Sequence, residues 1–136
     1  MTRRFIVEAD GGARGNPGAA AFGAVVIDPD SGDVLVERAE TIGHASNNVA
    51  EYRGLIAGLE AVAELDTNAL VRVRMDSKLV VEQMSGRWKI KHPDMRDLAM
   101  RARDVLPFEN VHYTWIPREQ NKAADALVNA ALDGRR

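Results

Sequence analysis

Four acidic residues, far apart in the sequence, are the best candidates for chemistry in this chain of 136 residues. Two of them, Asp10 and Asp76, directly follow short apolar runs with the pattern of β-strands. In open α/β sheets, ligands gather at the carboxyl ends of strands. The other two, Glu51 and Asp125, lie in the first turns of segments with helical periodicity. If these strand ends and helix starts meet at one edge of a sheet, the four carboxylates share one cleft.

Such a cluster of carboxylates points to bound metal ions. Four negative charges in a cleft repel one another strongly, because the effective dielectric constant there is low. Divalent cations remove this repulsion, and oxygen ligands without histidine or cysteine suit Mg²⁺ or Mn²⁺. Two such ions about 3.5–4 Å apart are a common apparatus for displacement at phosphorus. The four acids therefore predict a site for two Mg²⁺ ions, with Mn²⁺ as the alternative.

Each acid taken alone has a simpler explanation. Glu51 and Asp125 could favour the positive end of a helix macrodipole. Asp76 could cap a helix, and Asp10 could belong to an ordinary Asp-Gly turn. Glu51 fits its simple explanation least well, because it lies in line with the apolar Leu55. The case for chemistry therefore depends on the four acids together.

The elements that must position these acids follow from the hydrophobic pattern. Short alternating or apolar runs predict strands over 4–9, 22–28, 34–42, 70–75 and 111–116. Helical periodicity predicts helices over 47–65, 77–84, 94–106 and 122–132. The order β-β-β-α-β-α-α-β-α predicts an α/β fold, in which a hairpin sheet is extended by parallel strands into a five-stranded mixed sheet flanked by helices. The length fits a single domain, residues 1–136.

Composition excludes several classes of protein. The chain has no cysteine, which rules out a disulfide framework, an iron–sulfur cluster and a thiolate zinc site, and fits a reducing cytosol. Its start does not have the pattern of a signal peptide, and no stretch approaches the roughly 20 apolar residues of a membrane span. We therefore expect a cytoplasmic protein with no membrane partner.

Charge leaves the partner open. The formal net charge of −2 argues against a strongly basic nucleic-acid binder. However, basic residues are concentrated in one part of the chain: Arg87, Lys89, Lys91, Arg96, Arg101 and Arg103.

Four segments together resemble the signature blocks of the type 1 ribonuclease H family, in the family's order and over nearly the whole chain: DGGARGNPGAAAFG, SNNVAEYRGLIAGLEA, MDSKLVVEQMSGRWKIK and WIPREQNKAADALVNAA. The resemblance implies a ribonuclease H-like fold. It also implies an endonuclease that hydrolyses the RNA strand of RNA–DNA hybrids and leaves 5′-phosphate and 3′-hydroxyl ends. The family's catalytic, metal-binding acids match Asp10, Glu51, Asp76 and Asp125. One Mg²⁺ would activate the attacking water and the other would stabilise the departing 3′ oxygen.

The resemblance also implies contacts with the hybrid duplex. The matching positions are Gly11, Asn16, Ser46, Asn47, Asn48, Ser77 and Lys78. Among these, Ser46 and Asn47 match the helix start that grips a phosphate of the DNA strand. Amide side chains can reach minor-groove edges and 2′-hydroxyls, which distinguish RNA from DNA. The alternative roles for these residues are capping and turn formation.

A second group of expected contacts is the basic segment, which we define as residues 87–89. Trp88 could lay its ring on a sugar while Arg87 and Lys89 meet phosphates. Alternatively, Trp88 covers the edge of the core. The region is shorter than the basic protrusion of many bacterial members and resembles the archaeal-type and short bacterial subgroup. We therefore do not expect tight hybrid binding without further help.

The loop before Asp125 differs from that of many relatives, which place a mobile histidine there. Here the loop offers Arg118 and Glu119, which is similar to the archaeal-type subgroup with an arginine. Arg118 could steady a phosphate or the leaving group, and Glu119 could shuttle the second metal ion. We favour Arg118 as the catalytic residue.

Two rival functions remain at this stage. A non-catalytic module that binds hybrids or double-stranded RNA could use the same fold, but it would have no reason to keep all four acids. An integrase-like enzyme that cuts DNA could use the acids, but the asparagines suited to 2′-hydroxyls count against it. The favoured hypothesis is a monomeric, Mg²⁺-dependent hybrid ribonuclease.

Overall fold

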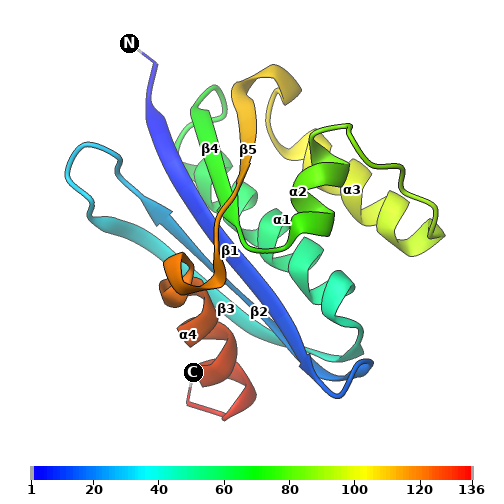
Figure 1. The fold of residues 1–136 in the computed structure, drawn as a ribbon. Coiled ribbons are helices and arrows are strands. Elements are labelled where there is room, and N and C mark those ends of the chain that lie inside the picture. The colour runs from blue at the N-terminus through cyan, green and yellow to red at the C-terminus, as the bar shows by residue number, and fades with distance from the viewer. Residues whose placement is uncertain (1, 136) are drawn as a thin grey trace.

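The order of helices and strands in the computed structural model, which describes residues 2–135, is the predicted one (Figure 1). The strands are β1 (Arg4–Arg14), β2 (Gly18–Ile27), β3 (Val34–Ala45), β4 (Leu70–Met75) and β5 (Val111–Trp115). The helices are α1 (Asn47–Leu65), α2 (Lys78–Met84), α3 (Pro93–Val105) and α4 (Lys122–Leu132). Two 3₁₀ turns, η1 (Phe108–Asn110) and η2 (Arg118–Gln120), flank β5.

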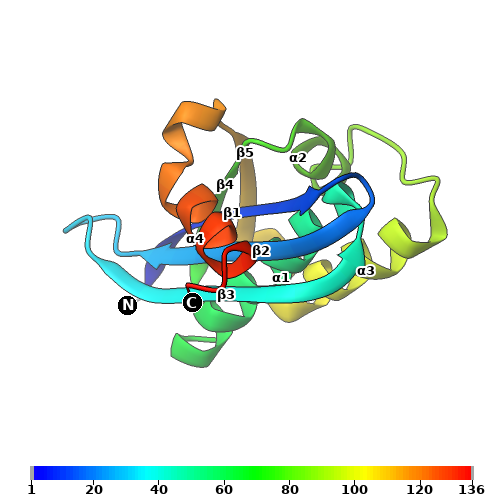
Figure 2. The ribbon, with the colours of Figure 1, turned by 90° about the horizontal axis from the view of Figure 1, so that it is seen from below.

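The five strands form one mixed sheet in the order β3-β2-β1-β4-β5. The pairs β1–β2 and β2–β3 are antiparallel, whereas β1–β4 and β4–β5 are parallel. Helices α1, α2 and α3 lie on one face of the sheet, and α4 lies alone on the other face, against β2 and β1 (Figures 1 and 2). The predicted mixed sheet with helical crossovers is therefore confirmed.

The core lies mainly between α1 and the sheet. The apolar stripe of α1 that predicted the helix is buried, and Tyr52, Leu55 and Leu59 have no exposed surface. Val7 of β1 and Val73 of β4 are equally inaccessible and belong to the same cluster. Within residues 2–135, no helix combines the length and the apolar character needed to cross a membrane.

Strand β1 differs from the prediction, because it continues through the glycine-rich segment to Arg14. Asp10 therefore lies within the strand and not directly after it, and no Asp-Gly turn forms there. The segment pairs with β2 from Gly11↔Phe22 to Arg14↔Ala19. The parallel pairing with β4 ends earlier, at Glu8↔Arg74. Asp10 thus lies beyond the region in which β1 pairs with β4, at the carboxyl end of the parallel strands.

Candidate active site

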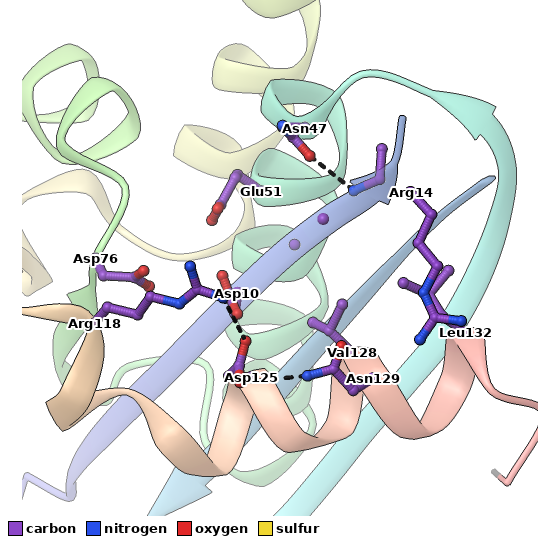
Figure 3. A pocket seen from close by; sticks show the side chains of 13 residues that line it. Asp10, Arg14, Asn47, Glu51, Asp76, Arg118, Asp125, Val128, Asn129 and Leu132 are labelled. Atoms are coloured by element: carbon purple, nitrogen blue, oxygen red, sulfur yellow. Dashed lines mark hydrogen bonds and ion pairs between the residues drawn. The ribbon is translucent and has the colours of Figure 1, made fainter. Parts of the chain in front are cut away.

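All four acids line one cleft of about 340 Å³, at the edge of the sheet between α1 and α4 (Figure 3). They come from four different elements. Asp10 is on β1, Glu51 is on α1, Asp76 directly follows β4, and Asp125 is in the first turn of α4. Glu51, in contrast, lies beyond the first turn of α1, so the helix macrodipole does not explain its position.

Close contact between β1 and α1 brings Asp10 and Glu51 together. A Cβ atom on Gly11 would collide with the backbone of Ala50 and Glu51. A Cβ atom on Gly54 would come within 2.5 Å of the carbonyl oxygen of Asp10. Because neither glycine has a side chain, the strand lies directly against the first turns of the helix. Gly11, expected to contact substrate, therefore also has this packing role.

Two of the four acids in the cleft, Asp10 and Glu51, have raised pKa values. Burial raises the pKa of Asp10 to about 7, with further contributions from Asp76 and Asp125, although the Gly11 amide partly opposes the shift. Burial, followed by the charges of Asp10 and Asp76, raises the pKa of Glu51 well above its ordinary value. Glu51 as a whole keeps some exposed surface, but its Oε2 atom is fully buried without a hydrogen-bond partner.

These features fit a divalent cation. The donor atoms are carboxylate oxygens, which suit Mg²⁺ or Mn²⁺, and the unpartnered Oε2 of Glu51 is an oxygen that a cation could satisfy. Among residues 2–135, no three acidic or histidine side chains already surround one metal-sized point. We expect small rotations of the side chains to accompany metal binding.

Asn121, which the sequence analysis did not single out, holds one of the acids in place. It is fully buried directly before α4. Its Nδ2 atom donates hydrogen bonds to Oδ1 of Asp76, at 2.7 Å, and to the carbonyl oxygen of Ala9, at 2.9 Å. From sequence it resembles a helix cap, yet its side chain makes no capping hydrogen bond. Its role depends on contacts with two distant segments.

The carboxylate of the fourth acid, Asp125, has two side-chain partners, Arg118 and Asn129 (Figure 3). Nη2 of Arg118 in η2 lies 3.8 Å from Oδ1 of Asp125, and Nδ2 of Asn129 donates a 3.4 Å hydrogen bond to Oδ2. The side chain of Arg118 is 80% exposed, so the ion pair is weak and the guanidinium is accessible to a ligand. Glu119 occupies the same turn and is exposed.

The asparagines expected to contact substrate also connect β1 to α1. The Oδ1 atom of Asn47, which lines the cleft, accepts a 2.7 Å hydrogen bond from the amide of Ala13. The amide of Asn47 donates to Oδ1 of Asn16 at 3.0 Å. Within the described part of the chain, both Nδ2 groups keep their donors available. Asn48 lies beside Asn47 and is exposed.

The two serines expected to contact substrate both cap helices. Oγ of Ser46 accepts from the amide of Val49 at the start of α1, and Oγ of Ser77 accepts from the amide of Val80 at the start of α2. Capping is therefore one role of each serine. Lys78, the next residue after Ser77, is exposed at the surface.

The basic segment, residues 87–89, lies in the connection between α2 and α3 (Figure 1). None of its three residues lines the cleft. Trp88 is 45% exposed, which disfavours the alternative in which it covers the core. Arg87 is already engaged, because its Nε and Nη2 atoms donate to Glu82 at 2.6 and 3.0 Å. The backbone carbonyl oxygen of Lys89 accepts a 3.3 Å hydrogen bond from Nε2 of Gln83.

Comparison with known proteins agrees with this geometry. Residues 8–131 match the family model described as "Reverse transcriptase-like". The chain is 53% identical over 131 residues to the bifunctional protein Rv2228c of Mycobacterium tuberculosis, covering 96% of this chain and 36% of that protein. It is 46% identical over 125 residues to ribonuclease HI of Halobacterium salinarum, covering 91% of this chain and 62% of that protein. The chain thus spans only part of the length of these relatives.

Solved structures extend the comparison to the fold. LC11-RNase H1, whose structure was determined in complex with an RNA/DNA hybrid, superposes with a TM-score of 0.88 at 40% sequence identity. The alignment covers 96% of this chain and 97% of that structure. With the sheet order, the cleft and the matched family model in agreement, the chain belongs to the type 1 ribonuclease H family.

Proposed function

We propose that the chain is an endonuclease that hydrolyses the RNA strand of RNA–DNA hybrids. The observation that carries the proposal is the convergence of Asp10, Glu51, Asp76 and Asp125 in one cleft. Burial and the neighbouring carboxylates raise the pKa of Asp10 and of Glu51, which supports a role for bound cations in this cleft. A binding module would have no need of such an arrangement, which costs stability.

The chemistry follows from the donor set. When bound, two Mg²⁺ ions, or Mn²⁺ in their place, would supply an activated water and stabilise the departing 3′ oxygen, giving 5′-phosphate and 3′-hydroxyl ends. The carboxylates of the four acids would hold these ions. Asn121 donates a hydrogen bond to Oδ1 of Asp76 and so restricts the directions in which that carboxylate can point. Arg118, exposed at the cleft, would neutralise charge on the phosphate undergoing attack.

Substrate selection would use the surroundings of the cleft. The Nδ2 donors of Asn16 and Asn47 lie where β1 meets α1, and such donors suit 2′-hydroxyls and minor-groove edges. Asn48 and Lys78 extend this polar surface at the starts of α1 and α2. The basic segment would meet a more distant part of the duplex through the exposed Trp88 and Lys89.

The test is incubation with end-labelled hybrid, RNA duplex and DNA duplex, with Mg²⁺, with Mn²⁺ and with chelator, followed by analysis of the product ends. We expect cleavage of the RNA strand of the hybrid only when metal is present, with 5′-phosphate and 3′-hydroxyl ends. Cleavage of the DNA duplex would favour an integrase-like enzyme instead. Hybrid binding without cleavage under either metal would favour a binding module.

We also propose that residues 1–136 act as one ribonuclease H domain and as a monomer in the cytoplasm. The single five-stranded sheet and the match of residues 8–131 to one family model support a single domain. Light scattering during gel filtration would measure the mass. A stable dimer with higher specific activity than the monomer would contradict the proposal.

A further inference from the structure

Trp115, the last residue of β5, makes two contacts beside the candidate active site. It pairs with Met75 in the sheet, and its indole Nε1 donates a 3.2 Å hydrogen bond to the carbonyl oxygen of Asp76. The ammonium group of Lys78 lies 5.6 Å from the centroid of its ring. Trp115 is nevertheless 45% exposed, so burial in the core does not account for its position.

The first contact completes the restraint of Asp76. Asn121 binds the carboxylate of this acid from inside the protein, and Trp115 binds its carbonyl group from the surface. No strand holds Asp76, because β4 ends at Met75. A metal-binding side chain just beyond the end of a strand needs such supporting contacts to stay within about 0.5 Å of its productive position. Trp115 and Asn121 therefore restrict the backbone and the side chain of the same acid.

The second contact restrains Lys78, two residues further along. A lysine side chain at the surface ordinarily samples many rotamers, and holding it over an aromatic face reduces that freedom before a ligand arrives. One indole ring therefore contacts both the side chain of Lys78, a cation suited to a phosphate, and the backbone of Asp76, an acid suited to a metal ion.

We propose that Trp115 is a positioning residue that orients Asp76 for metal binding and Lys78 for a phosphate of the nucleic-acid substrate. The proposal rests on the proposed function of the cleft. It assigns no reacting role to the indole itself, which acts only through its two neighbours.

Two substitutions separate the two contacts. Trp115→Phe keeps an aromatic ring under Lys78 but removes the indole donor, so kcat for hybrid cleavage should fall about fivefold with little change in KM. Trp115→Leu removes both contacts, so KM should additionally rise about threefold. The dependence of log KM on log salt should also become shallower, by less than the value of about 0.9 expected for complete loss of one phosphate contact, because the charge of Lys78 remains.

Phe108→Leu is the matched control. Phe108 is also an exposed aromatic residue under a cation, with Arg103 at 4.1 Å from its ring centroid, but it lies in η1. This control should leave kcat and KM unchanged, and thermal unfolding of each variant separates lost activity from lost folding. If Trp115→Phe retains the wild-type kcat, or if Phe108→Leu lowers kcat equally, the proposal is wrong.

A spectroscopic measurement tests the same proposal without activity. The chain has two tryptophans, so Trp88→Phe leaves Trp115 as the only indole emitter. Addition of Mg²⁺ should change its emission, and Asp76→Asn in the same background should abolish the change. An emission spectrum that does not respond to Mg²⁺ would overturn the proposal. If the wild-type protein cleaves no hybrid, the proposed function fails, whereas the emission response still decides whether Trp115 is coupled to Asp76.

Discussion

The acidic cleft and the basic segment are two expected nucleic-acid contacts built in opposite ways. The cleft takes its four acids from four elements and holds them through buried partners such as Asn121. The basic segment consists of three consecutive, exposed residues held by local hydrogen bonds. Changes in the cleft should therefore have large and coupled effects, because every group there affects its neighbours' charge or geometry. Changes in the basic segment should have small and additive effects.

The largest effect is expected from Asp76→Asn. The amide keeps the shape of the side chain but is a much poorer ligand for a divalent cation, so kcat should fall by about a thousandfold or more. Hybrid binding should remain intact or become stronger, because one negative charge near the phosphates is lost. Single-turnover cleavage and fluorescence anisotropy with labelled hybrid would measure the two quantities.

Asp104→Asn is the control for this substitution, because it removes an equal charge from an exposed position on α3. Its kcat should match that of the wild type. Full activity of Asp76→Asn would refute the two-metal assignment.

The second effect is a dependence of metal affinity on pH. Because the pKa of Asp10 is about 7 in the protein alone, Mg²⁺ must displace a proton at lower pH. Mg²⁺ affinity should therefore rise by at least about tenfold per pH unit below about pH 7, and the raised pKa of Glu51 should add to this rise. Isothermal titration calorimetry at several pH values would measure this dependence. Asp10→Asn should flatten it, and an affinity independent of pH would contradict the charge balance of the cleft.

The same shift predicts how the metal-free protein responds to pH. The ordinary pKa of Asp10 is 3.8, so between about pH 4 and 7 unfolding releases a proton, and the free energy of unfolding decreases as pH rises. The raised pKa of Glu51 acts in the same direction. Thermal unfolding in chelator should give a falling Tm over this range, and Mg²⁺ should reduce the fall. A Tm that rises with pH in chelator would be inconsistent with the raised pKa values of Asp10 and Glu51.

The third effect concerns Asn121→Ala. The substitution removes the hydrogen bonds to Asp76 and Ala9 and leaves the buried carbonyl oxygen of Ala9 without this donor. Unfolding should become easier by about 1–3 kcal/mol. In addition, kcat should fall about tenfold, since Asp76 loses its orientation.

Asn129→Ala provides a comparison for Asn121→Ala, because it removes an exposed, 3.4 Å hydrogen bond to Asp125. Chemical denaturation and kcat measurements on both variants should show the larger loss for Asn121→Ala. Equal losses would indicate that burial of the supporting amide is unimportant.

The contrast between the two regions also explains what could be predicted from sequence. Helices α1 and α4 and strand β4 were predicted to the residue, because each carries a complete periodic pattern with clear flanking residues. The extension of β1 to Arg14 was not predicted, since glycine is disfavoured in strands. Pairing with β2 outweighs this preference.

The four acids could be identified because each lies near a predicted strand end or helix start and the four together suggest one site, whereas their supporting residues could not be identified. Asn121 and Trp115 are an ordinary asparagine before a helix and an ordinary aromatic residue in a strand. Their roles arise only when the fold brings both of them against Asp76. Local patterns contain no information about such contacts between distant segments.

The smallest effects are expected in the basic segment, and they should differ between its two cations. The guanidinium of Arg87 already donates to Glu82, so a phosphate must compete with a carboxylate for it. The ammonium of Lys89 has no such competitor among residues 2–135. Lys89→Ala should raise KM about threefold and make the salt dependence of log KM shallower by about 0.9. Arg87→Ala should change both quantities less.

Glu82→Gln tests the reason for this difference, because it removes the competing charge while keeping a side chain of the same shape. Arg87 is then free to meet a phosphate, so KM should fall up to about threefold and its salt dependence should become steeper. In the double variant Glu82→Gln/Arg87→Ala the gain should disappear, since it depends on the released guanidinium. A gain that persists in the double variant would mean that Glu82 repels the substrate directly and that Arg87 takes no part in binding.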